Sequence, residues 1–286
     1  YIDASHPNET RIVLKSNDSI EEYEFEDKNN LNFKNNIYLG TISRVEPSLQ
    51  AAFVNFGRDR HGFLAFNDIQ SDYYQIPSED KEIIKIAEEK IRENLKNKTI
   101  ENSQENSSPE INTNFNEINE KAEVNGNIKN EEVEKKEFRD EVKSSYGIKR
   151  YKIQEVIKPG QIVLIQVIKE ERGQKGAALT TFISLAGKYL VLMPNTPKGG
   201  GISRKIFNSS DRQKIRNILN EIDIPKSMGV IVRTAGANKT KNEIEKDFQN
   251  TLKTWEEIKN TALDSNAPSL VYEEGDIIKR TLRDIY

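Results

Sequence analysis

The chain has 286 residues, of which 35% are hydrophobic and 31% are charged, and its formal net charge at pH 7 is −3. The length suggests one to three domains, and the low apolar fraction indicates that part of the chain does not pack into a core. The absence of cysteine excludes disulfides, thiolate metal sites and cysteine nucleophiles within this sequence.

The sequence offers few signals for a metal cage or a membrane. Its two histidines, His6 and His61, are too isolated for a zinc cage, and no apolar run approaches about 18 residues. The first residues lack the basic-then-apolar order of a secretory signal. We therefore expect a soluble, cytoplasmic protein.

Two strands are predicted early in the chain, over Ile37–Val45 and Ala51–Phe56. In the second strand, alternation puts Phe53 on one face together with Ala51 and Asn55. The polar Asn55 marks this face as the solvated one. We therefore expect an exposed ring at Phe53.

The next strand repeats this arrangement after a turn at Gly57–Arg60, because His61 shares one face with Phe63. Two rings on the solvated side of a small sheet resemble the stacking platforms on which barrels of the OB type hold single-stranded nucleic acid. The alternative is that both phenylalanines belong to the core. The cations expected around the rings are Arg58, Arg60 and Lys175.

Residues 79–149 have a different composition from the rest of the chain. Residues 79–148 hold 18 acidic and 12 basic residues, whereas the remainder holds 28 acidic and 31 basic residues. The segment is rich in Asn, Glu, Lys and Ser, so it cannot bury enough apolar surface to offset its ordering entropy. We predict a disordered acidic insertion, either a tolerated loop or a mobile arm that shields an RNA-binding face.

Strand patterns resume after the insertion. A turn at Pro159-Gly160 precedes a predicted strand over Gln161–Ile168, and Ala177–Leu185 supplies another. Together with the earlier strands this makes about five, the number in an OB barrel.

A second group of motifs follows. A strand within Leu185–Pro194 is followed by a glycine-rich loop at Lys198–Ile206, and a buried strand over Gly229–Val232 ends at Arg233 and Thr234. A tight turn and a helix come next. The helix begins with a capping-box pattern from Thr240 to Glu243 and has an apolar face made of Ile244, Phe248, Leu252, Trp255 and Ile258.

Arg233 and Thr234 place a guanidinium and a hydroxyl at the exit of a strand, close to a helix start. Fork-shaped donors and unpaired amides form a suitable site for an anion such as a terminal phosphate. On pattern alone, an arginine at a strand end can equally be a solvated or ion-paired surface residue. Trp255 is expected in the core, because it continues the apolar stripe of the helix.

The segments GTISRVEPSLQAAFVNFGRDRHGFL, KEERGQKGAALTTFISLAGKYLVLMP, GGGISRKI and GVIVRTAG, with the closing KRTLRDIY, resemble the amino-terminal part of bacterial ribonuclease E/G endoribonucleases. The resemblance covers nearly the whole chain except roughly residues 79–149. It implies an α+β fold in which an S1 barrel of OB type and a 5′-sensor α/β subdomain are inserted into a split RNase H-like subdomain. The implied ranges are 1–33 and 278–286 for the RNase H-like parts, 34–179 for the S1 barrel with its insertion, and 180–277 for the sensor.

The resemblance also implies roles for individual residues. In the S1 barrel, Phe53, Phe63 and Lys175 fall on positions that the family uses to hold RNA near the scissile bond. In the sensor, the residues implied to bind the 5′-monophosphate and the terminal nucleotide are Gly187, Val191, Arg204, Arg233 and Thr234.

The family cleaves single-stranded RNA, in RNA processing and mRNA decay, with Mg²⁺ held by two aspartates in a DNase I-like subdomain. The resemblance places those aspartates, and the cysteines of a structural Zn²⁺ site, beyond the last residue of this sequence. We therefore assign no catalytic residue and no metal ligand here, and expect this chain to bind RNA without cutting it. The start without methionine and the abrupt end indicate a truncated, incomplete RNase H-like part.

Partners and location are also implied by the resemblance. They are single-stranded RNA with a 5′-monophosphate rather than DNA, sister subunits in a homotetramer, and RNA-decay enzymes bound to a tail not present here. The parent protein is expected in the cytoplasm, with association at the inner membrane as an option.

Two other classes of function stay open. A stand-alone S1-type RNA-binding protein without nuclease activity accounts for the barrel but gives no purpose to GGGISRKI and IVRTAG. A structural assembly module accounts for the helices and the insertion but not for exposed rings at Phe53 and Phe63.

Overall fold

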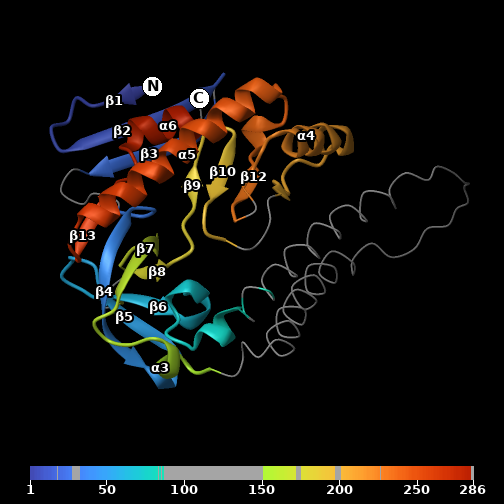
Figure 1. The fold of residues 1–286 in the computed structure, drawn as a ribbon. Helices are drawn as coiled ribbons and strands as arrows, with labels where there is room; N and C mark the ends of the chain where they lie inside the picture. Colours follow the sequence, from blue (N-terminus) through green and yellow to red (C-terminus); the bar gives the residue numbers. More distant parts are fainter. Residues whose placement is uncertain are drawn as a thin grey trace, which may run out of the picture. The chain divides into compact units, whose positions relative to one another are not determined.

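The fold was taken from a computed structural model, shown in Figure 1. It describes residues 1–17, 19–27, 33–82, 84, 86, 151–171, 175–196, 201–225 and 227–284. Most of the predicted insertion at residues 79–149 therefore lies outside the described residues. The chain divides into two compact units, one made of Tyr1–Tyr74, Ile153–Thr196 and Gly200–Tyr286 and the other of Gln75–Lys152 with Pro197–Gly199.

The first unit contains a closed barrel of five strands. Its strands are β4 (Ile37–Glu46), β5 (Ala51–Asn55), β6 (Gly62–Ala65), β7 (Ile162–Lys169) and β8 (Ala178–Thr180). Around the ring, β4, β5 and β6 pair antiparallel, β6 pairs with β8 in parallel, and β7 joins β8 to β4. A closed five-stranded barrel in a mixed α+β fold is compatible with the OB-type prediction.

Alternation along the strands fills the barrel. Val54, Leu64 and Ile165 have no exposed surface, so apolar burial stabilises the ring at about 1.5–3 kcal/mol for each such side chain. Gly62 allows the ring to close, because a Cβ atom there would lie 2.3 Å from Leu179 Cδ1. Short 3₁₀ helices follow β4 and β6, at Pro47–Leu49, Phe66–Asp68 and Ser71–Tyr73, and the short helix α3 covers Ile153–Val156.

The single strand predicted over Ala177–Leu185 was wrong. Strand β8 ends at Thr180, and β9 (Leu185–Ala186) belongs to another sheet. The cause is a set of hydrogen bonds that replaces the ladder: the Thr181 amide and hydroxyl both donate to the Asp68 carbonyl, at 2.9 Å each. The chain then leaves the barrel.

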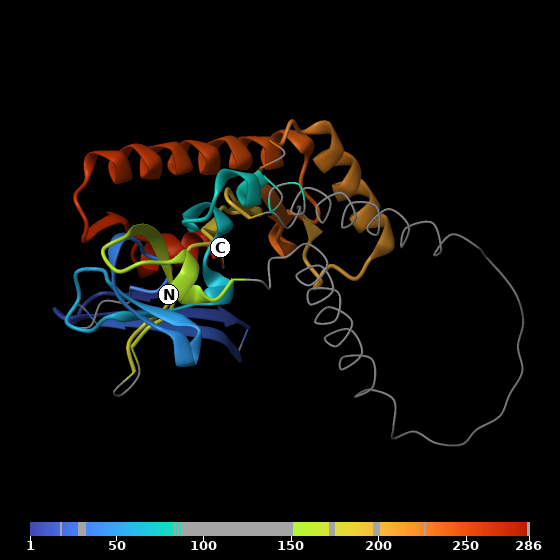
Figure 2. The same cartoon turned by 60° about the horizontal axis from the view of Figure 1, so that its bottom comes forward.

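The second sheet has the order β11-β12-β10-β9, with β10 at Leu190–Met193, β11 at Gly201–Ile202 and β12 at Gly229–Val232. One of its faces is covered by α5 (Lys241–Asp264), which Figure 2 shows as a long uninterrupted helix. The capping box predicted from Thr240 and Glu243 is confirmed, with reciprocal hydrogen bonds between side chain and backbone.

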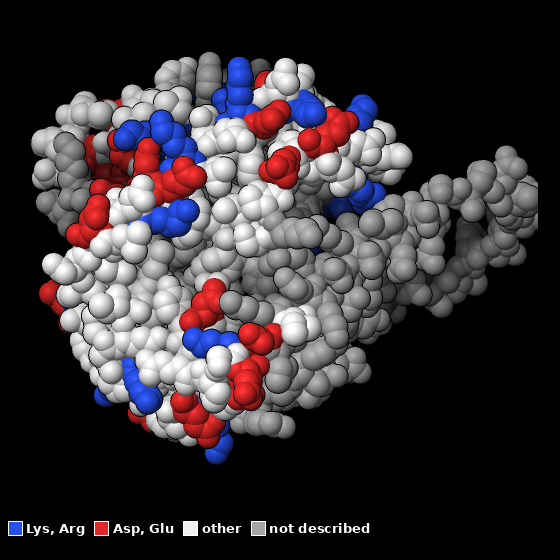
Figure 3. Space-filling view, viewed as in Figure 1, with Lys and Arg blue, Asp and Glu red and all other residues white. Residues whose placement is uncertain are grey.

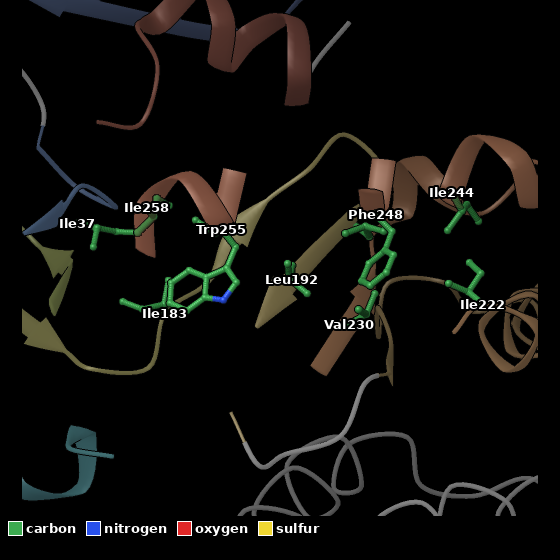
Figure 4. Packing of buried hydrophobic residues seen from close by; sticks show 11 residues of the cluster. Ile37, Ile183, Leu192, Ile222, Val230, Ile244, Phe248, Trp255 and Ile258 are labelled. Atoms are coloured by element: carbon green, nitrogen blue, oxygen red, sulfur yellow. The ribbon is translucent and has the colours of Figure 1, made fainter. Parts of the chain in front are cut away.

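The core between α5 and the second sheet is apolar (Figure 4). Phe248 and Trp255 of α5 pack into one cluster with Leu192 and Val230 of the sheet. Trp255 is 9% exposed, so its predicted place in the core is confirmed. Helix α4 (Ser209–Glu221) begins at Asn208, whose side chain accepts a hydrogen bond from the Ser210 amide.

The third sheet is formed by β1 (Ile2–Asp3), β2 (Glu9–Ser16) and β3 (Ser19–Asp27) in sequence order. Helix α6 (Ile277–Asp284) packs against β2 and β3. Glu26 of β3 ties the two together: its carboxylate accepts from the Ile277 amide at 3.0 Å and from Arg280 at 3.3 Å. The first and last segments of the chain therefore lie side by side.

Strand β13 (Ser269–Tyr272) leads from α5 to α6 and pairs antiparallel with the start of β4. It thereby joins the barrel sheet, although its sequence lies within the range predicted for the sensor. In the other unit, the Tyr151 hydroxyl donates to Asp80 at 2.5 Å. Among the described residues, no helix has the length and hydropathy that a membrane crossing requires.

Candidate nucleic-acid interface

The two predicted rings lie opposite each other on the barrel. Phe53 of β5 pairs in register with Phe63 of β6, and their ring centroids are 6.0 Å apart in an edge-to-face arrangement. Both rings are half-buried, whereas the adjacent Val54 and Leu64 are fully buried. The rings therefore lie on the outer face, but neither is as exposed as the alternation predicted.

One residue predicted on the solvated face shares that face with Phe53 but is not exposed to solvent. Ala51 is fully buried, although alternation groups it with Phe53. The segment at Ile153 lies against this end of β5, where the Ile153 amide donates to Gln50 Oε1 at 3.3 Å. A segment distant in the sequence thus covers a position that the local pattern predicts to be exposed.

A cation that sequence analysis missed lies directly on this platform. Arg44 of β4 is in register with Phe53, and its guanidinium carbon is 4.4 Å from the ring centroid. Arg58 was expected beside the rings, but its guanidinium instead stacks on Phe33 at 3.8 Å. The pairing register between β4 and β5 decides which arginine reaches Phe53. The alternation of residues along one strand gives no information on how that strand pairs with its neighbour.

A shallow hollow of about 420 Å³ opens beside Phe53. Its lining combines one ring with two cations and a histidine: Arg44, Phe53, Asp59, Arg60, His61 and Gly176. Gly176 is required there, because a Cβ atom would lie 2.2 Å from the His61 carbonyl oxygen. Its neighbour Lys175 is exposed and lies next to this lining. The barrel thus places Phe53 against Phe63, and Lys175 adjoins Gly176 in the chain.

The second candidate region is the end of β12. Arg233 follows this strand, and its Nη1 donates to the Gly187 carbonyl at 2.9 Å and to Asp284 Oδ1 at 2.5 Å. Val191 of β10 is in register with Ile231 of β12, and both are half-buried on the face away from the α5 core. Thr234 is exposed immediately after Arg233.

Arg204 lies near the same end of β12. It follows Ser203, whose amide donates to the Val232 carbonyl at 2.9 Å, and its side chain is exposed. The five predicted sensor residues therefore come from three segments that meet at β12. Arg233 also forms an ion pair with Asp284. The alternative predicted from the sequence, an ion-paired arginine at the surface, is therefore correct for one of its nitrogens.

Asp247 supports this region from α5 and was not predicted. Its carboxylate accepts hydrogen bonds from the amides of Lys188, Tyr189 and Leu190 at 2.8 to 3.1 Å. A Cβ atom at position 187 would lie 2.5 Å from Asp247 Oδ2, so glycine is needed there. One feature of the sequence could have indicated the role of Asp247: it is an acidic residue next to the apolar stripe of the helix, between Ile244 and Phe248.

A polar network runs from the buried Glu274 to Asp284 at the surface. The Arg283 guanidinium bonds to both carboxylate oxygens of Asp284 and, through Nη1, to Glu274 at 2.8 Å. Burial raises the pKa of Asp284, but the hydrogen bonds from Arg283 and Arg233 outweigh burial and hold that pKa below its ordinary value. Glu274 is buried and also accepts a hydrogen bond from the Asn35 side chain.

Charges elsewhere are mixed. On the face shown in Figure 3, lysine and arginine side chains lie among aspartate and glutamate side chains rather than in one basic field. Specific contacts at the two regions described above, rather than the net charge, are the features that suit an anionic polymer.

Comparison with known proteins gives a consistent result. The model of the ribonuclease E/G family matches residues 184–286. Ribonuclease E of Escherichia coli is 35% identical over 283 residues, which are 99% of this chain and 20% of that protein. Ribonuclease E of Haemophilus influenzae is 34% identical over 284 residues, 99% of this chain and 23% of that protein.

This chain belongs to the ribonuclease E/G family.

Within the ribonuclease E/G family, the similarity extends to both branches. Ribonuclease G of Haemophilus influenzae is 27% identical over 278 residues, 97% of this chain and 43% of that protein. The chain spans about a fifth of the length of the two ribonuclease E relatives. Among the described residues, no three His, Asp or Glu side chains lie close enough together to hold a metal ion.

Proposed function

We propose that this chain is the RNA-binding and 5′-monophosphate-sensing part of a bacterial endoribonuclease that cleaves single-stranded RNA in RNA processing and mRNA decay. The observation that carries the proposal is the outward pair Phe53 and Phe63, with Arg44 over Phe53, on a closed barrel. Each base stacked on such a ring contributes about 1–3 kcal/mol.

In this proposal the chain uses two sites on one RNA strand. The barrel is the S1 domain, where the rings, Lys175 and the hollow beside Phe53 hold the strand near the scissile bond. The region at the end of β12 is the 5′ sensor, where Arg233 and Thr234 bind the terminal phosphate. Val191 and Gly187 lie near the terminal nucleotide, and Arg204 supplies a further positive charge.

The third sheet and α6 are, in this proposal, the two edges of a split RNase H-like subdomain. Its support is the contact between Glu26 and the first turns of α6, which joins residues from the two ends of the chain. In this proposal, cleavage by the whole protein uses Mg²⁺. A homotetramer, a structural Zn²⁺ site and association with other RNA-decay enzymes remain proposals for the whole protein.

The test is a titration of the chain with fluorescently labelled single-stranded RNA of one sequence, carrying either a 5′-monophosphate or a 5′-hydroxyl. Arg233→Ala should weaken binding of the phosphorylated RNA about 10- to 100-fold, the loss expected for a hydrogen bond to a charged group. Thr234→Ala should act in the same direction. Binding of the hydroxyl RNA should change little.

Two further variants serve as controls. Phe53→Ala should weaken both RNAs alike, because the barrel contacts bases rather than the 5′ end. Lys253→Ala removes an exposed cation of α5 and should change neither RNA by more than about twofold. An equal loss for both RNAs in Arg233→Ala would rule out the sensor assignment. Affinity that does not decrease with salt would rule out binding through phosphate contacts, and no measurable affinity would rule out RNA binding.

A further inference from the structure

The hydrogen bonds of Arg233 leave one edge of its guanidinium available. Nη1 carries two hydrogens, and its two acceptors are the Gly187 carbonyl and Asp284 Oδ1. Among the described residues, Nε and Nη2 have no hydrogen-bond partner. These two nitrogens form the fork that binds a phosphate or carboxylate through two parallel hydrogen bonds.

Asp284 is itself held firmly. Arg283 donates from Nε to Oδ1 at 3.0 Å and from Nη2 to Oδ2 at 2.8 Å. The third nitrogen of Arg283 bonds to Glu274, which is 8% exposed and whose amide donates to Asn36 Oδ1 at 2.9 Å. The position of the Asp284 carboxylate is therefore fixed by a network anchored at the start of β4.

We propose that Asp284 is a positioning residue for 5′-phosphate recognition: it and the Gly187 carbonyl together hold Arg233 by Nη1, so that the Nε and Nη2 edge faces an incoming phosphate. A free arginine side chain loses rotamer entropy when it binds a ligand, and an arginine held in place in advance loses less of it. The inference rests on the proposed sensor function and adds a residue to it.

The charge balance allows this role. Asp284 remains paired with Arg283 when a phosphate binds Arg233, so neither carboxylate nor guanidinium is left unpaired in a half-buried site. Side-chain exposures of 27% for Arg233 and 31% for Asp284 leave room for a ligand at the surface. If Asp284 only competed with the phosphate for Arg233, its removal would have the opposite effect and the phosphorylated RNA would bind more tightly.

The experiment measures the ratio of affinities for 5′-monophosphorylated and 5′-hydroxyl RNA in Asp284→Ala, Asp284→Asn, Arg233→Ala and the double alanine variant. Asp284→Ala should lower this ratio about tenfold with unchanged affinity for the hydroxyl RNA. In the Arg233→Ala background, Asp284→Ala should have no further effect on the ratio, because Asp284 acts only through Arg233. Asp284→Asn keeps Oδ1 as an acceptor and should recover most of the ratio.

Glu273→Gln is the matched control, since it removes one exposed negative charge from the segment before α6. It should leave the ratio unchanged. An unchanged or increased ratio in Asp284→Ala would overturn the inference, and so would an Asp284→Asn variant no better than Asp284→Ala. Either result, alongside a selective loss in Arg233→Ala, would leave the proposed function intact; a non-selective loss in Arg233→Ala would instead refute the proposed function itself.

Discussion

At the scale of single residues, the barrel face combines two kinds of contact that respond differently to salt. Phe53 and Phe63 offer flat apolar surface to bases, whereas Arg44 adds a positive charge on top of Phe53. Stacking releases few counterions, and neutralising one phosphate of a single strand changes the slope of log K against log salt by about 0.7. The two contributions can therefore be separated by measurement.

We expect Phe63→Ala to weaken binding of single-stranded RNA by about 1–3 kcal/mol without changing the salt slope. Arg44→Ala should reduce the slope by about 0.7. Fluorescence titrations at four or more salt concentrations provide both quantities. Phe207 is a matched control, because this ring is 89% exposed outside the barrel and its replacement by alanine should leave RNA affinity unchanged. A shallower slope in Phe63→Ala would contradict the stacking role.

At the scale of secondary-structure elements, α5 is the helix that holds the second sheet and the β12 end in place. Its capping box fixes where it begins, and its apolar stripe covers β9 and β10. Asp247 on the same helix fixes the turn that contains Gly187. The geometry of the proposed sensor thus depends on the burial of α5.

We expect Phe248→Ala to lower the free energy of unfolding by about 3–5 kcal/mol, because its ring is 1% exposed and its removal leaves a cavity. Leu263→Ala on the same helix should change the free energy by less than about 0.5 kcal/mol, because this side chain is 84% exposed. Urea denaturation followed by circular dichroism measures both. Similar losses in the two variants would contradict the packing of α5 described above.

At the scale of the whole molecule, chain order and spatial order differ. Residues from the first and last thirty positions meet at Glu26 and Arg280, and β13 pairs with β4 although more than 200 positions separate them. The predicted insertion separates β6 from β7, which lie in one barrel. Closure of a barrel across so long a segment is feasible, because the entropy cost of closing a loop grows slowly with its length.

We expect deletion of residues 79–148 to leave RNA affinity and its salt slope unchanged, since the barrel closes through strands on both sides of this segment. A short glycine and serine linker would replace it. Titration of both chains with the same RNA is the measurement. Tighter binding after the deletion would support the alternative in which the acidic segment shields the RNA-binding face.

The sequence by itself determined the strand predicted at residues 37–45, which the structure extends by one residue, and the strand at residues 229–232. It also determined the start and apolar face of α5, and the outward position of Phe53 and Phe63. These features follow from local periodicity and capping chemistry, which act over a few neighbouring residues. From the strand and turn pattern alone, Arg233 and Thr234 at the end of β12 could form either an anion site or a surface ion pair. The resemblance to a family favoured the anion site.

Only the tertiary structure decided which distant groups meet. The register of β4 against β5 puts Arg44, not Arg58, over Phe53, and hydrogen bonds at Asp68 end β8 earlier than its apolar pattern predicts. The contact of Arg233 with Asp284 joins groups 51 positions apart. Such pairings depend on how sheets and helices pack, and that information is spread over the whole chain rather than contained in any one segment.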